Sequence, residues 1–179
     1  MNETSVKQPR HKHEFSPLRV LAGVLVGVTV LAYLIGPRPI PRERANRVIC
    51  MANLHALYAA LNLYAGEYGN AYPPPEKWCD LLVNRFAREE SFQCREAMGQ
   101  RCAYAMNPRA DRLSAPDVVL LLESIGGWNQ FGGSELLTTE RHKGGCNVLF
   151  VGGEVKFVKA EEIPALRWES RDNGRDEEK

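Results

Sequence analysis

The chain has little net charge and few aromatic residues. Its formal net charge is +1 over 179 residues, and 8% of the residues are aromatic. A protein that binds nucleic acid needs a basic face, which is often interleaved with aromatic side chains. No such stripe is visible, so we predict that nucleic acid is not a partner.

Sequence motifs of the common enzyme classes are also missing. The chain has no Ser–His–Asp order, no phosphate-binding glycine loop and no paired carboxylate motif. It has no internal repeat and no alternation of strands with helices, which would indicate a parallel sheet. We therefore predict a protein that is not an enzyme and uses no cofactor. The alternative to this prediction is a metal-dependent enzyme.

The spacing of the five cysteines is not typical of a zinc site. No C-x-x-C and no H-x-x-x-H occurs, whereas structural zinc sites usually contain closely spaced ligand pairs. The set that could coordinate zinc is Cys79, Cys94 and Cys102 with His142 or Cys146. We predict no metal.

Five cysteines in a small domain favour a compartment in which disulfides form. Cys94 and Cys102 are a candidate pair, because they would close a small loop across a glycine. Cys50 could pair with Cys79 or remain a buried thiol. Spacing alone does not decide the pairing.

An uncharged apolar run occupies residues 20–36, and Pro17 and Leu18 extend it. Its length lies at the low end for a membrane-spanning helix. A cleaved signal peptide is the main alternative, since a basic start and an apolar core fit it too. The run is longer than a usual signal core, and Gly-Pro-Arg-Pro after it is a poor cleavage site. We predict an uncleaved transmembrane helix over residues 17–36.

The flanking segments are polar or rich in proline. We predict a disordered cytosolic tail over residues 1–19 and a disordered tail over residues 169–179. Proline at alternate positions of residues 37–41 predicts a stiff spacer. Lys and Arg are balanced on the two sides of the anchor, so the cysteines alone place the main domain outside the cytosol. Gly23 and Gly27 form a G-x-x-x-G that would let two anchors associate, although glycine is common in membrane helices in any case.

Residues 42–68 predict one long amphipathic helix. Apolar residues recur at steps of three and four, and proline is absent until residue 73. The expected buried seam consists of Cys50, Leu54, Leu57, Leu61, Tyr64 and Tyr68. Such a helix needs an apolar surface to cover.

The rest of the chain predicts a small antiparallel sheet. Strands are expected at residues 102–107 and 118–123, and a hairpin at residues 148–158 turns on Gly152 and Gly153. A short helix is expected over residues 78–86. One long helix against this sheet makes a two-layer α+β domain over residues 42–168.

Three stretches carry a family resemblance. They are residues 47–64 with the following Tyr-Pro-Pro, the Tyr-Ala-Met-Asn that ends at Asn107, and His142-Lys-Gly-Gly-Cys-Asn-Val-Leu-Phe-Val-Gly-Gly153. Together they resemble type IV pilin-like proteins, including type II secretion pseudopilins and other prepilin-type proteins with a carboxy-terminal His-x9-Asp-Gly motif. The resemblance implies a pilin-like fold, an anchor in the bacterial inner membrane and a periplasmic main domain.

The sequence departs from this family at two places. The leader around Glu14 and Phe15 lacks the preceding Gly and the helix Glu, and it contains Pro17. Gly152 stands where the family motif has Asp, which removes an oxygen ligand that calcium would favour. Both departures favour a permanent membrane anchor over a polymerising subunit.

The family motif and one glycine-flanked loop supply the candidate interaction residues. They are His142, Gly144, Gly145, Asn147, Gly152, Gly153, Trp128 and Asn129. We expect His142 to be structural and hydrogen-bonded to backbone, although Glu123, Glu135 and Glu140 are possible partners. Trp128 would either contact a ligand or pack onto the sheet edge. The leading hypothesis is a non-catalytic envelope protein that works through protein partners or self-association, and the alternative is a membrane-tethered module that binds a small ligand or carbohydrate.

Overall fold

The computed structural model describes residues 16–36, 41–97 and 99–169. The chain divides into two compact units, Met1–Pro39 and Ile40–Lys179, which are described separately. The predictions of a disordered tail at each end and of a stiff spacer fall almost entirely outside the described residues.

Helix α1, Pro17–Ile35, is an apolar helix with no buried residue. Pro17 suits its first turn, because the backbone N–H that proline lacks would have no helical partner there. Helix α1 and the next helix, α2 (Arg42–Glu67), are both long and apolar enough to cross a membrane, but 39% of the apolar window in α2 is buried. The near-terminal α1 therefore fits a membrane anchor or a signal sequence, and α2 is a core helix.

Helix α2, Arg42–Glu67, buries the predicted seam except at its end. Its residues Cys50, Leu54, Leu57, Leu61 and Tyr64 are buried. The inclusion of Tyr68 was wrong, because the helix ends one residue earlier and Tyr68 is 46% exposed. Its ring instead stacks on Tyr64, with 4.3 Å between the centroids.

Short elements connect α2 to the sheet. They are η1 (Pro75–Lys77), α3 (Trp78–Leu82) and η2 (Glu89–Phe92). The expected helix over residues 78–86 is shorter than predicted because Val83 adopts an extended conformation and ends it. Trp78, Leu82 and Phe92 are fully buried, so this segment packs into the core despite its irregular backbone.

Four antiparallel strands form a meander in the order β1-β2-β3-β4. The strands are β1 (Tyr104–Met106), β2 (Val119–Glu123), β3 (Gly145–Phe150) and β4 (Val155–Lys159). Every residue of the first three strands is buried. An irregularity between Val119 and Leu121 shifts the β2–β3 register. These findings confirm the α+β class and the antiparallel sheet.

The β3–β4 turn is tight, but it is longer than the predicted two-residue turn. Phe150 N–H donates to the Glu154 carbonyl at 2.9 Å, and Gly153 N–H donates back to the Phe150 carbonyl at 2.8 Å. Three residues therefore lie in the loop. Gly153 has φ +88°, as expected for the last position of a three-residue hairpin loop.

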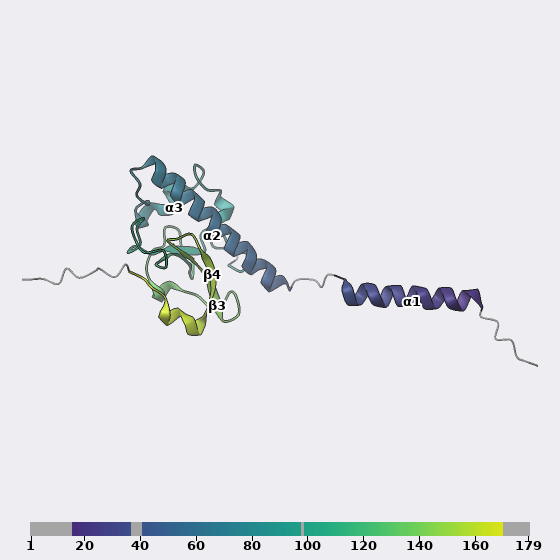
Figure 1. The fold of residues 1–179 in the computed structure, drawn as a ribbon. Coiled ribbons are helices and arrows are strands. Elements are labelled where there is room, and N and C mark those ends of the chain that lie inside the picture. The colour runs from purple at the N-terminus through teal and green to yellow at the C-terminus, as the bar shows by residue number, and fades with distance from the viewer. Residues whose placement is uncertain (1–15, 37–40, 98, 170–179) are drawn as a thin grey trace, which may run out of the picture. The chain divides into compact units, whose positions relative to one another are not determined.

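The sheet is buried on both faces, so the two-layer description was incomplete. Helix α2 packs on β3 and β4 on one face, together with α3 and η2. The second face carries a separate apolar cluster with Val119, Leu122, Val148 and Phe150. Residues of η3 (Ser134–Leu136) and of the segment around η4 (Ala160–Ala165) cover this cluster. Figure 1 shows α2 along one side of the domain and the yellow η4 segment on the other.

Candidate functional site

A fully buried group of polar side chains lies where α2 crosses the sheet. Glu123 is the last residue of β2, Asn147 lies in β3, and His142 lies in the turn before β3. The side chains of Glu123 and His142 are 0% exposed. Buried charges need partners, so the neighbours of Glu123 decide what this group can do.

Three hydrogen bonds satisfy the Glu123 carboxylate. It accepts from the Asn147 backbone N–H at 2.7 Å and from Asn147 Nδ2 at 2.8 Å, and it contacts His142 Nε2 at 3.1 Å. Asn147 Nδ2 also reaches the Arg47 carbonyl in α2 at 3.3 Å. The network therefore fastens the long helix to two strands of the sheet.

Two cysteines adjoin this network. The Sγ atoms of Cys50 and Cys94 are 2.7 Å apart, and Cys94 Sγ lies 3.8 Å from His142 Nε2. The ligand atoms of Cys50, Cys94, Glu123 and His142 all lie within 4.8 Å of one another. Two thiolates, an imidazole and a carboxylate are a ligand set that fits zinc. This set differs from the one considered in the sequence, because Cys79 and Cys102 are not part of it.

The group is electrostatically coupled when its thiols are reduced. Burial lowers the pKa of His142, but hydrogen bonds to Cys94 and Glu123 outweigh it and raise the pKa to about 9. The Cys50 thiol, by donating to Cys94, lowers the pKa of Cys94 to about 5. The same hydrogen bond, with burial, raises the pKa of Cys50. The reduced group thus favours an imidazolium between a thiolate and a carboxylate.

His142 is buried, and its hydrogen-bond partner differs from the expected one. It contacts the Glu123 carboxylate rather than a backbone carbonyl, and its Nδ1 is buried without a hydrogen-bond partner. His142 and Asn147 are 1% and 0% exposed, so neither can contact a protein partner in this structure.

The motif glycines serve the fold. Gly144 has φ +86°, and a Cβ on Gly145 would clash with the Phe157 ring. A Cβ on Gly152 would lie 2.9 Å from Pro116, and one on Gly153 would lie 2.6 Å from the Tyr58 ring. A positive φ therefore accounts for Gly144, and close packing accounts for Gly145, Gly152 and Gly153.

The cysteine pairing suggested by spacing is not the one that the structure brings together. Cys94 adjoins Cys50, and Cys102 Sγ lies 3.8 Å from Cys79 Sγ. All five cysteines are buried as thiols. Spacing misled here because α2 and the connecting segment meet face to face, which gives contacts between residues far apart in sequence.

The loop that carries Trp128 packs onto the sheet edge, whereas the Trp128 ring itself packs on the segment between α2 and β1. Residues 130–132 pair with β1 through Met106. Trp128 packs on Phe92 and donates from Nε1 to Asp80 Oδ1 at 2.6 Å. Asn129 Oδ1 accepts from the Cys79 backbone N–H at 2.8 Å. The loop therefore covers an otherwise open strand edge.

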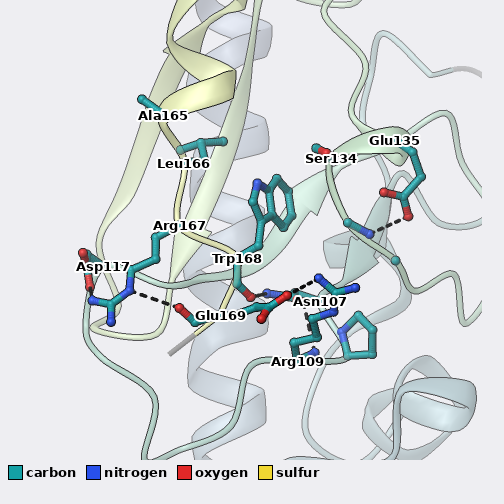
Figure 2. A pocket seen from close by; sticks show the side chains of 13 residues that line it. Asn107, Arg109, Asp117, Ser134, Glu135, Ala165, Leu166, Arg167, Trp168 and Glu169 are labelled. Carbon is teal, nitrogen blue, oxygen red and sulfur yellow. Dashed lines mark hydrogen bonds and ion pairs between the residues drawn. The ribbon is translucent and has the colours of Figure 1, made fainter. Parts of the chain in front are cut away.

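A pocket of about 810 Å³ lies elsewhere, at the C-terminal end of the described chain. Figure 2 shows Trp168 projecting between Asn107 and Arg109 on one side and Leu166 on the other. Asn107 holds the pocket wall, because its Nδ2 donates to the Trp168 carbonyl at 2.9 Å and to the Val119 carbonyl at 2.7 Å.

Four of the five charged side chains at this pocket form two ion pairs, and the fifth, Glu135, accepts from the Gly133 backbone N–H at 2.7 Å. Arg167 binds Asp117 at 2.9 Å, and Arg109 binds Glu169. The pocket therefore presents a half-buried aromatic ring beside polar groups rather than a concentrated charge. The sequence does not predict this pocket, because its walls come from four separate stretches of the chain, residues 107–109, 117, 132–135 and 165–169.

The sequence analysis named Glu123 as a possible partner of His142 and Asn147 as a motif residue, but it did not predict that the three form one buried network, although the sequence contains a signal. Glu123 closes an unbroken apolar run, and Asn147 interrupts another, so each carries a polar group into a buried strand. A buried carboxylate requires donors nearby.

No protein-family model, curated protein or solved structure matches this chain.

Proposed function

We propose that this protein is a single-pass, pilin-like protein of the bacterial inner membrane with an extracytoplasmic domain and a structural or assembly role. The observation that carries the proposal is α1. Its 19 residues bury no side chain, and their only charge is Arg19 near the start. At about 1.5 Å per residue, such a helix matches the roughly 30 Å hydrocarbon layer.

The domain supports a pilin-like identity through its order of elements. A long helix with one buried face precedes a small antiparallel meander, and it packs on that meander. The network of Glu123, His142 and Asn147 has the burial expected of a structural device, since a substrate would need access to it. The absent leader Glu and the proline-rich segment after α1 favour a permanent anchor over filament growth.

Partner capture by the full-length protein tests the assembly role. Detergent-solubilised full-length protein should retain a stoichiometric partner or a second copy of itself, and residues 41–179 alone should retain less. A Gly23→Ile and Gly27→Ile double variant is the matched control for the anchor. A Cβ at either glycine meets no atom within 4 Å, so the substitutions should leave the helix itself intact. Loss of self-association in this variant would identify the G-x-x-x-G face. Monomeric full-length protein without a partner would contradict the proposal.

The pocket around Trp168 favours a second candidate, a membrane-tethered module that binds carbohydrate. An aromatic ring beside polar side chains suits a neutral sugar, because the ring covers its apolar face and the polar groups bind its hydroxyls. Calorimetry with neutral oligosaccharides should then show binding that Trp168→Ala abolishes and that Leu113→Ala preserves, since Leu113 is 90% exposed. Absence of binding by the intact protein would reject this candidate.

A further inference from the structure

We propose that the mature protein contains two disulfide bonds, Cys50–Cys94 and Cys79–Cys102, and that Cys146 remains a thiol. The inference rests on the proposed extracytoplasmic location for its oxidising environment. The pairing itself rests on geometry that is independent of the location.

The sheet separates the cysteines into two sets. Cys50, Cys79, Cys94 and Cys102 belong to the apolar cluster on the α2 face. Cys146 belongs to the cluster on the opposite face. Since a disulfide needs Cβ atoms within about 4.5 Å of each other, Cys146 has no partner across the sheet.

Within the α2 face, each of the four cysteines has one close cysteine neighbour. The Sγ atoms of Cys50 and Cys94 are 2.7 Å apart, and those of Cys79 and Cys102 are 3.8 Å apart. The members of the first pair are 44 positions apart in sequence, and those of the second are 23 apart. The second pair begins inside the loop that the first pair closes, so both bonds would enclose residues 79–94.

The enclosed segment explains what the bonds would do. Between α2 and β1 the described chain has only the short elements η1, α3 and η2, which supply few backbone hydrogen bonds of their own. Cys50–Cys94 would fasten this segment to the first half of α2, and Cys79–Cys102 would fasten its start to the residues that precede β1. Cross-links of this kind restrict the unfolded chain most where the enclosed loop is long.

A metal held by Cys50, Cys94, Glu123 and His142 is the competing interpretation. A dication with two thiolates, one carboxylate and a neutral imidazole leaves a buried net charge of −1. With the thiols oxidised, an imidazolium and a carboxylate remain and balance each other, which costs less in a buried site. Among the described residues this is the one group with metal-ligating spacing, so a metal would leave the Cys79–Cys102 contact unexplained.

The oxidation is a balanced exchange with a thiol–disulfide oxidoreductase. In each pair, a thiolate attacks the carrier's disulfide, and the second cysteine then displaces the carrier. Two thiols lose two protons and two electrons, and the carrier disulfide becomes a dithiol. Within the first pair, Cys94 is the sulfur nearer to the surface, because it lines a surface hollow of about 800 Å³ together with Asn53 and Gln93, although only 3% of the residue is exposed.

Peptide mapping of the full-length protein tests the pairing. Protein extracted from membranes into detergent is alkylated at once, digested without reductant and analysed by mass spectrometry. A second sample is reduced and then reoxidised in a glutathione buffer. We expect peptides linked through Cys50–Cys94 and Cys79–Cys102 in both samples, and a single alkylation, at Cys146, after denaturation.

The two samples separate the pairing from the proposed location. Any other linkage in the glutathione sample, or four unlinked thiols, overturns the pairing. Zinc that is retained stoichiometrically by protein in which these four cysteines are unlinked would identify the metal site instead. Correct links in glutathione but thiols in the membrane extract would leave the pairing standing and reject the extracytoplasmic location.

Variants show whether the two bonds form independently. Cys146→Ser should retain both linked peptides, because this residue lies on the other face of the sheet. A Cys50→Ser and Cys94→Ser double variant should retain Cys79–Cys102 alone. Reduction should lower the urea midpoint of the wild type but leave unchanged that of a variant with all four paired cysteines replaced by serine. Equal sensitivity of both proteins to reductant would contradict the proposal.

Discussion

Replacing Glu123 by glutamine should destabilise the domain far more than the size of the change suggests. The carboxylate accepts two hydrogen bonds from Asn147, at 2.7 and 2.8 Å, and contacts His142 Nε2 at 3.1 Å. A glutamine can accept through one oxygen only, and its NH₂ group would face a donor. Removing one partner of a buried pair costs about 3–5 kcal/mol, and the retained oxygen places Glu123→Gln near the lower end, at about 3 kcal/mol.

Urea unfolding of the full-length protein in detergent, followed by tryptophan fluorescence, measures this cost. With a slope of about 1.5–2 kcal/mol per molar urea, the midpoint should fall by about 1.5–2 M. Glu154→Gln is the matched control. Glu154 pairs with Lys156 at 2.9 Å, but both side chains are more than half exposed, so its loss should cost under about 1 kcal/mol. Equal midpoints for the two variants would refute the claim that Glu123 is a buried, fully paired carboxylate.

Three further predictions concern the core, the hairpin and the titrating group. Leu57→Ala, at a fully buried position of α2, should cost about 2–5 kcal/mol in the same assay, and a cost below 1 kcal/mol would place the seam outside the core. Gly153→Ala should destabilise the domain by about 1–3 kcal/mol, because the residue has a positive φ and a tyrosine ring lies 2.6 Å from the new Cβ. Gly66→Ala in α2, where a Cβ meets no atom within 4 Å, should be neutral or stabilising. A larger loss of stability in Gly66→Ala than in Gly153→Ala would contradict the hairpin geometry. With the thiols reduced, the raised pKa of His142 gives stability that is full below pH 6.5 and is lost towards pH 9, while the lowered pKa of Cys94 gives the opposite slope over that range. Cys94→Ser removes the opposing slope and also one of the two contacts that raise the pKa of His142, so the decline in the urea midpoint that Glu123 alone causes should appear between pH 6.5 and 9. A variant as flat as the reduced wild type would contradict this pairing of His142 with Glu123.

The parts of the fold that are local in sequence were predictable. The three-and-four spacing from Cys50 to Tyr64 predicts the buried side of α2, because helical periodicity places those residues on one face. The apolar run before Glu123 and the glycines after Val151 likewise predict β2 and the β3–β4 hairpin. Each of these signals depends on neighbours within a few positions.

Features that depend on how distant segments meet were not predictable. Tyr68 continues the seam by spacing, but the chain leaves the helix before it, so its ring is half exposed. The spacing of Cys94 and Cys102 suggested a pair, whereas tertiary packing brings Cys94 to a residue 44 positions away. The second covered face of the sheet was missed for the same reason, because η4 follows the last strand and folds back over it.

The buried network of Glu123, His142 and Asn147 was only partly predictable from the sequence. The sequence suggested a structural His142 and named Glu123 among its candidate partners, but it favoured a backbone partner. The choice depends on β2 and β3 pairing as neighbours, which places Glu123 beside Asn147 and the turn before β3. Such pairing is a property of topology, and the residues themselves supply only the requirement that a buried carboxylate finds donors.

The membrane-anchored, extracytoplasmic placement can be tested most directly with one exposed cysteine. The five native cysteines are buried, and Leu113 is 90% exposed, so Leu113→Cys creates a single reactive thiol on the native domain. Spheroplasts that express this variant are treated with a membrane-impermeant maleimide, and their membranes are then washed with carbonate. We predict that the protein is labelled before lysis and stays with the washed membranes. Labelling only after lysis, or release of the protein into the soluble fraction, would contradict the account.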